Sequence, residues 1–104
     1  MARWRYNLAE CGTALREAIS DGNEDFESCK NVMNALKICL ERLKEIMPED
    51  DYSYYFSDIA EDVENMAGNE LYDYTDEQEA VEAVDGELAE FYDACDVARV
   101  WVAL

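Results

Sequence analysis

The sequence predicts an all-α fold, a small bundle of three long helices with a short helix before them. Apolar residues recur at steps of three and four in three long segments, the pattern of helices that bury one face. Residues that favour helix starts precede two of these segments, and proline or glycine follows two of them. A chain of 104 residues is long enough for one core, so residues 1–104 are expected to fold as a single helical domain.

A short helix is expected over residues 9–20, where five apolar residues share one face and Gly22 ends the segment. These residues are Leu8, Cys11, Leu15, Ala18 and Ile19. Before this helix, residues 3–6 alternate as a strand does, and residues 100–102 are rich in β-formers. The termini either pair as a two-stranded ribbon or dock as coil, and Trp4 and Trp101 are expected to close the core.

The strongest helix is expected over residues 25–47. Its apolar stripe spans three heptads and is widened by one further row, which indicates the core helix of a bundle. The stripe comprises Phe26, Cys29, Met33, Leu36, Leu40, Leu43 and Met47, with Val32, Cys39 and Ile46 beside it. Lys30, Lys37 and Lys44 recur along one edge, where they either pair with carboxylates of neighbouring helices or form a basic docking stripe. Ile38 projects to the side opposite the stripe.

A second long helix is expected over residues 51–67. Pro48 separates it from the preceding helix, and Asp50 or Asp51 is expected as its N-cap. The Gly68-Asn69 pair is expected to end it. Its buried face comprises Tyr52, Phe56, Ile59, Val63 and Met66.

A third long helix is expected over residues 76–98. Residues 75–78 have the T-x-x-Q form of a capping box. The apolar stripe comprises Val81, Val84, Leu88, Phe91, Cys95 and Ala98. Glu77 projects toward the apolar face and is expected to cap the helix. Gly86 lies on the opposite face, where it is either tolerated at a cost of about 1 kcal/mol or leaves room for a partner backbone.

The composition excludes several classes of function. The chain has no histidine, so Ser-His-Asp and Cys-His nucleophiles, helical zinc sites and His-containing di-iron sites cannot form. No Gly-rich phosphate loop occurs among the four glycines. The acidic stretches 21–27 and 49–51 do not follow the spacing of a calcium loop. We therefore expect a protein that is not an enzyme, with no catalytic residue, no cofactor and no metal ion.

The net charge of −18 and the cysteines bear on partners and compartment. The longest apolar run, residues 100–104, is far shorter than the roughly 20 residues that span a bilayer, and no signal peptide opens the chain. The negative charge disfavours direct binding to nucleic acids or to anionic membranes. The cysteines fall on apolar helix faces, so buried reduced thiols and a cytoplasmic location are expected, with a disulfide or reactive thiol as the alternative. They are Cys11, Cys29, Cys39 and Cys95.

The charge is divided unevenly along the chain. Residues 1–48 carry seven basic and eight acidic groups, a net of −1, whereas residues 49–104 carry 18 acidic groups and only Arg99, a net of −17. Carboxylates three or four residues apart on a helix stand about 5–6 Å from one another, similar to phosphates along a nucleic acid strand. This surface is either merely solvated or meant for a basic partner. The candidate partner-binding residues are Asp58, Glu61, Glu64, Glu79, Glu82, Glu90 and Asp93.

Both ends of the chain carry longer motifs. The chain opens on Arg3-Trp4-Arg5-Tyr6 and Gly12-Thr13-Ala14-Leu15-Arg16-Glu17-Ala18-Ile19, and it closes on Phe91-Tyr92-Asp93-Ala94-Cys95-Asp96-Val97-Ala98-Arg99-Val100-Trp101-Val102. These ends resemble those of small acidic proteins encoded by bacterial phages and mobile elements. The resemblance implies such an origin. It brings no established activity, so no functional residue follows from it.

Two functions from different classes fit these observations. The main prediction is a non-enzymatic inhibitor or decoy that presents its acidic face, in place of a nucleic acid, to a basic protein of the host or of a defence system. Such a partner would be a nucleic-acid-binding protein, for example a restriction or CRISPR component. The alternative is a helical adaptor or homo-oligomerising module that binds through apolar and aromatic residues. These are Ile38, Tyr54, Tyr72, Tyr74 and the two tryptophans.

Overall fold

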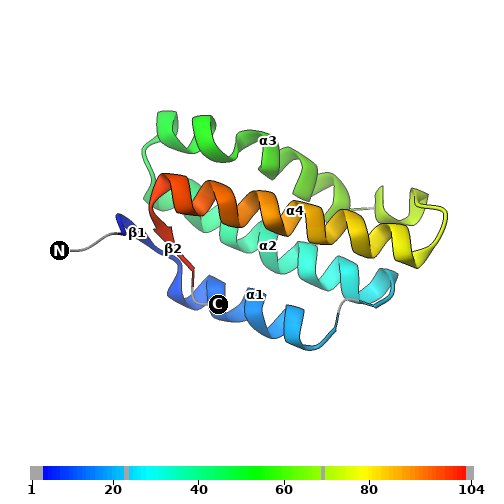
Figure 1. The fold of residues 1–104 in the computed structure, drawn as a ribbon. Coiled ribbons are helices and arrows are strands. Elements are labelled where there is room, and N and C mark those ends of the chain that lie inside the picture. The colour runs from blue at the N-terminus through cyan, green and yellow to red at the C-terminus, as the bar shows by residue number, and fades with distance from the viewer. Residues whose placement is uncertain (1–3, 23, 69, 103–104) are drawn as a thin grey trace.

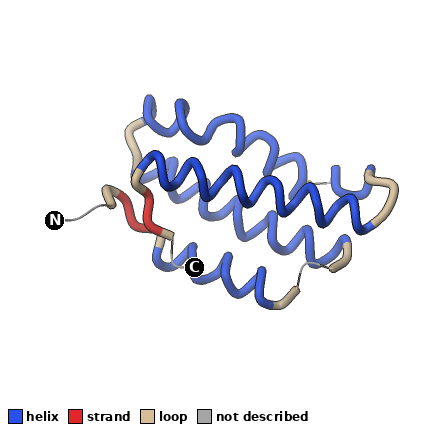
Figure 2. The backbone as a smooth tube through the Cα atoms, in the orientation of Figure 1, coloured by secondary structure: helices blue, strands red, loops and turns tan. Residues whose placement is uncertain are grey.

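The computed structural model describes residues 4–22, 24–68 and 70–102, and it confirms the all-α bundle (Figure 1). Figure 2 shows that helices make up most of the described chain. The elements in chain order are β1 (Tyr6–Asn7), α1 (Ala9–Ser20), α2 (Phe26–Ile46), α3 (Glu49–Ala67), the 3-10 helix η1 (Glu70–Asp73), α4 (Glu77–Ala98) and β2 (Val100–Trp101). The three long helices and the short N-terminal helix therefore occur where the sequence predicted them.

The central element of the bundle is α2. It packs against α1, α3 and α4, and α4 also packs against α3. In Figure 1, α4 lies across the front of α2 and next to α3, while α1 lies along the other side of α2. Because α1 packs mainly on α2, it is the least enclosed of these helices.

One hydrophobic core joins all four of these helices to β2. The central helix contributes the largest share of its buried residues, as its wide apolar stripe predicted. These are Cys29, Val32, Met33, Ala35, Leu36, Cys39, Leu40 and Leu43. The rings of Phe56 and Phe91 lie 6.1 Å apart between centroids and connect α3 to α4. On the outer side of α2, Ile38 is 54% exposed, so no described part of the chain covers it.

The start of α2 is fixed by a capping box. The Asp25 side chain accepts a hydrogen bond from the Ser28 backbone N–H at 2.8 Å, and the Ser28 hydroxyl accepts one from the Asp25 N–H at 3.0 Å. The bond from the Ser28 backbone, helped by the Ser28 side chain, lowers the pKa of Asp25. The first backbone N–H of α2, that of Phe26, bonds to a residue of another helix. It donates to Oε2 of Glu77, at the start of α4, at 3.0 Å. Glu77 therefore caps α2, whereas the sequence suggested that it caps its own helix.

Two predicted helix starts are wrong by one or two residues. The helix α3 begins at Glu49 with Pro48 as its N-cap, so Asp50 and Asp51 lie inside the first turn and do not cap it. The fixed backbone of proline suits a helix start, and the Tyr52 N–H already donates to the Pro48 carbonyl at 3.0 Å. At α4 the N-cap is Asp76, which accepts from the Glu79 N–H at 2.9 Å, and is not the threonine before it.

The two ends of the chain pair as a parallel two-stranded ribbon. Tyr6 lies opposite Val100, and Asn7 lies opposite Trp101. The backbone N–H of Leu8 donates to the Trp101 carbonyl at 2.9 Å. Of the two arrangements that the sequence left open, the ribbon is therefore the one that forms, although it is shorter than the two β-rich segments. Residue 3, at the start of one of them, lies outside the described residues.

As expected, a glycine follows the end of two helices. Gly22 has a φ of 120°, a conformation that favours glycine, and it follows the last turn of α1. Gly68 is the C-cap of α3 and donates to carbonyls of the last turn. The neighbouring Asn69, also expected to end this helix, lies outside the described residues.

Candidate functional site

The seven predicted partner-binding residues all have exposed side chains on α3 and α4. Asp58, Glu61 and Glu64 belong to α3. Glu79, Glu82, Glu90 and Asp93 belong to α4. They do not all lie together, because Glu61 and Glu64 line a hollow beside α2, whereas Glu90 lies at the contact between α3 and α4.

Carboxylates converge at the contact between α3 and α4. Oxygen atoms of Asp62, Glu87 and Glu90 all lie within 4.8 Å of one another. Asp62 and Glu90 are exposed, whereas Glu87 is only 9% exposed and is the one buried charged residue of the described chain. The ring of Phe56 on α3 also packs against that of Phe91 on α4, which holds the same two helices together. We call these three residues the seam carboxylates.

Two of the seam carboxylates were not among the predicted site residues. Glu90 is one of the seven predicted residues, whereas Asp62 and Glu87 are not. The sequence did carry a signal for Glu87, because it follows Val84 by three residues and precedes Phe91 by four. That spacing puts it on the buried face of α4. A carboxylate in an apolar stripe is uncommon, since burying a charge is costly.

Glu61 and Glu64 lie on a different surface. They line a hollow of about 560 Å³ between the end of α2 and α3, together with Lys44. Tyr52 also lines this hollow, and burial, followed by the nearby Glu41 carboxylate, raises the pKa of its phenol. The seven predicted residues thus belong to at least two surfaces, only one of which contains the seam carboxylates.

The carboxylates at the start of α4 take part in local hydrogen bonds. Oε2 of Glu79 accepts from the Thr75 N–H at 3.2 Å, next to the Asp76 cap. Oε1 of Glu82 accepts from the Gln78 side-chain amide at 3.3 Å. These bonds leave both side chains exposed, so the carboxylates of α4 remain accessible from solution.

Two of the three lysines along the edge of α2 do not form the predicted ion pairs. Among the residues that the structure describes, Lys37 and Lys44 form no ion pair with a carboxylate. An ion pair that does form on this helix joins Arg42 to Glu45 at 3.0 Å, between two exposed side chains. The prediction that the lysine edge pairs with neighbouring helices is therefore wrong for these two lysines.

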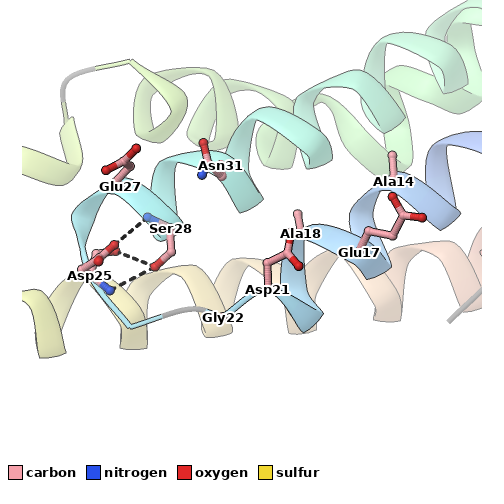
Figure 3. Close-up of a pocket in the computed structure, with 9 residues that line it drawn as sticks. All are labelled: Ala14, Glu17, Ala18, Asp21, Gly22, Asp25, Glu27, Ser28 and Asn31. Carbon is pink, nitrogen blue, oxygen red and sulfur yellow. Dashed lines mark hydrogen bonds between the residues drawn. The ribbon is translucent and has the colours of Figure 1, made fainter.

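A second acidic hollow, of about 440 Å³, lies where α1 turns into α2 (Figure 3). Its lining includes Glu17, Asp21, Asp25 and Glu27. Figure 3 shows that the hydrogen bonds in this region belong to the Asp25 cap. Because Asp25 serves as the N-cap of α2, the presence of this acidic residue in the hollow is explained by helix capping and does not require a ligand.

The two tryptophans are not core residues, contrary to the prediction. Trp4 and Trp101 are each 36% exposed. They line a shared hollow of about 320 Å³ with Arg5, Tyr6 and Asn7. The ribbon of β1 and β2 therefore presents aromatic surface to the outside. Tyr54 is also exposed, at 82%, on the first half of α3.

Comparisons with known proteins add no assignment. No family model, no curated protein and no solved structure matches the chain. Among the described residues, none of the helices combines the length and the apolar character that crossing a bilayer requires. The candidate site therefore has to be interpreted from its own geometry and charge.

Proposed function

We propose that this protein is a non-enzymatic binding protein whose acidic α3–α4 surface engages a basic macromolecule in place of a nucleic acid. The convergence of the seam carboxylates carries the proposal. The exposed carboxylates of Asp62 and Glu90 repel one another at this distance, which is a cost to the isolated chain. A basic partner would remove that repulsion on binding, which makes the surface most favourable in a complex.

The distribution of charge supports the same proposal. The net charge of residues 49–104 is −17, well beyond the magnitude of about 2–8 that keeps a small domain soluble. Such a surface attracts a basic groove over a distance, so it speeds association and makes binding sensitive to salt. The proposal places the protein in the cytoplasm, where nucleic-acid-binding enzymes act. It also agrees with the phage or mobile-element origin that the ends of the chain suggested.

Within the proposed surface, α4 and its seam with α3 are the parts best suited to meet a basic partner. Glu61 and Glu64 face a hollow that also contains a lysine, so they are offered to a basic partner less directly. Asp62 and Glu90 meet across two helices and are exposed. The chain therefore supplies a matched pair of variants that remove the same charge from two surfaces.

The test compares Asp62→Asn/Glu90→Gln with Glu61→Gln/Glu64→Gln in capture from host lysate. Partners are bound by tagged protein at about 0.1 M salt and released at about 0.5 M, a range over which exposed charge pairs become largely screened. Double-stranded DNA is added as a competitor in a parallel elution. We expect the seam variant to retain much less partner than the wild type, and the Glu61/Glu64 variant to retain nearly as much.

Three outcomes would contradict the proposal. Equal loss in both variants would indicate a general effect of net charge. Capture that persists at high salt and is insensitive to DNA would indicate apolar binding. Capture unchanged in the seam variant would exclude that surface.

A second candidate function rests on the tryptophan hollow. Two half-exposed tryptophans beside Arg5 are the kind of surface that protein interfaces use. Under this alternative the protein is an adaptor or forms homo-oligomers through the β1–β2 ribbon. Trp4→Ala/Trp101→Ala would then abolish partner capture at both salt concentrations, whereas the acidic-surface function predicts that this variant still captures its partner.

A further inference from the structure

Cys11 of α1 and Cys39 of α2 are in contact where the two helices pack together. Sγ of Cys39 donates to the backbone carbonyl oxygen of Cys11 at 3.2 Å. Burial raises the pKa of the Cys39 thiol, and the neighbouring Cys11 raises it further. Both cysteines are free thiols in this structure. The Cys39 thiol, 28 positions along the chain from Cys11, therefore lies directly against that residue.

The two thiols differ in their access to solution. Cys11 is half-buried and lines an open hollow of about 480 Å³ with Leu8, Glu10 and Arg42. Cys39 is buried. Burial, with a smaller effect of Cys11, raises the pKa of Cys39 to about 12, so this thiol is protonated at neutral pH. A dissolved oxidant therefore reaches Cys11 first, and Cys39 lies behind it.

We propose that Cys11 and Cys39 form a thiol–disulfide site that reacts with hydroperoxides and locks α1 onto α2. Cys11 is the residue that reacts with the peroxide, and Cys39 is the residue that resolves the product. An accessible thiol with a second thiol beside it is the arrangement of cysteines that are oxidised reversibly. The proposal is independent of the acidic surface, because neither cysteine belongs to α3 or α4.

The reaction balances in two steps. The Cys11 sulfur attacks one oxygen of hydrogen peroxide, the O–O bond breaks, and the products are a sulfenic acid and one water. Cys39 then loses its proton to solvent and its sulfur bonds to the Cys11 sulfur, the S–O bond breaks, and the hydroxide that leaves takes up a proton to give a second water. The dithiol is oxidised by two electrons and the peroxide is reduced by two. A thiol such as glutathione reverses the change by exchange.

The resolving step depends on the thiolate form of Cys39. Since the pKa of Cys39 is raised to about 12, its thiolate fraction grows roughly tenfold for each pH unit between 7 and 9. Disulfide closure should accelerate with pH by a similar factor. At neutral pH the sulfenic acid on Cys11 should live long enough to be trapped by dimedone.

Closing the disulfide should stabilise the least enclosed helix. The bond would link residues 28 positions apart and so restrict the unfolded chain. We expect the unfolding midpoint to rise by several degrees in the oxidised protein. Backbone amides of α1 should exchange more slowly with solvent, because α1 could no longer separate from α2.

The experiment treats the folded, reduced protein with hydrogen peroxide and follows it by intact mass and peptide mapping. The wild type should lose two hydrogen atoms and yield a Cys11–Cys39 linked peptide. Cys39→Ala should stop at a dimedone-reactive sulfenic acid on Cys11. Cys11→Ala should leave Cys39 unmodified, and Cys29→Ala, which changes a buried thiol outside the pair, should behave as the wild type does.

Other outcomes would overturn the proposal. These are a Cys39–Cys95 disulfide, modification of Cys11 no faster than that of Cys29, or a sulfenic acid that does not close to the disulfide even at pH 9. Circular dichroism of each alanine variant before treatment shows whether it is folded. Should Cys39→Ala fail to fold, the pH dependence of closure in the wild type decides the question by itself.

Discussion

The two halves of the chain bury the same kind of surface and expose different kinds. Residues 1–48 and 49–104 both contribute apolar stripes at helical spacing to a single core. On the outside, the first half carries a net charge of −1 and contains the exposed Arg42–Glu45 ion pair. The second half carries −17 and brings carboxylates against carboxylates at the seam. The core therefore determines how both halves fold, whereas only the second half carries a large excess of charge that folding does not explain.

The shared core stabilises the fold, whereas the acidic surface of the second half lowers stability and therefore calls for a functional explanation. Repulsion between neighbouring carboxylates costs a few tenths of a kcal/mol for each helical pair, and that cost falls almost wholly on α3 and α4. A surface that is unfavourable in the isolated chain becomes favourable when a basic partner covers it. If the halves share one core and differ only in surface, core substitutions should act alike in both halves and charge substitutions should not.

The largest effect is expected in the core, where the two halves should behave alike. Leu36 of α2 and Phe91 of α4 have no exposed surface. Replacing either by alanine should lower the free energy of unfolding by about 2–5 kcal/mol, because each change removes buried apolar area and leaves a cavity. Urea unfolding followed by circular dichroism measures the loss. Two separate transitions in either variant would show that the halves are not one cooperative unit.

A smaller effect is expected at the start of α4. Asp76→Ala should cost about 1 kcal/mol, because it removes the side chain that accepts from the Glu79 N–H. Thr75→Ala should cost much less, although the T-x-x-Q pattern points to this residue. The same urea experiment compares them, and a greater loss for Thr75→Ala would mean that the sequence pattern located the cap better than the structure does.

Acid should weaken the corresponding cap in the first half. Hydrogen bonds from Ser28 lower the folded-state pKa of Asp25 below the usual 3.8. Its stabilising contribution is therefore complete above about pH 4 and is lost as the pH falls through the lowered value. A carboxyl titration by NMR should give a midpoint for Asp25 below 3.8. A midpoint at or above 3.8 would contradict the cap geometry.

Most of the fold could be predicted from sequence because it depends on local spacing. The stripe of α2 and the glycine and proline at helix ends act within a few residues, so their consequences can be derived from the chain alone. The seam could not be predicted, because Asp62 and Glu87 meet only once the rotation and register of α3 against α4 are known. The exposure of Trp4 and Trp101 depends in the same way on how the termini pair.

A modest gain is expected at Gly86, in the acidic half. A methyl group added there would meet no atom within 4 Å, and the glycine lies inside a helix. Gly86→Ala should therefore raise the free energy of unfolding by about 1 kcal/mol. If the variant is more stable but no longer captures its partner, the result would show that the missing side chain of Gly86 leaves room for the backbone of that partner. Should stability fall, the helix is strained in a way that the open surface does not show.

The smallest effect bears most directly on the contrast between the halves. Changing Glu79, Glu82 and Glu90 to Gln and Asp93 to Asn removes four charges from α4, and the amides retain acceptor oxygens for the local hydrogen bonds. At low salt we expect stability to rise by about 0.3–1 kcal/mol in all, because several like-charge pairs are relieved. The matched control changes Glu10, Glu17, Glu24 and Glu27 to Gln in the nearly balanced half, where little or no gain is expected.

Added salt should reduce the difference between the two variants, since it screens the same repulsion in the wild type. Equal gains in stability from both sets would mean that charge repulsion destabilises the acidic half no more than the other. Repulsion would then give no reason to expect a basic partner.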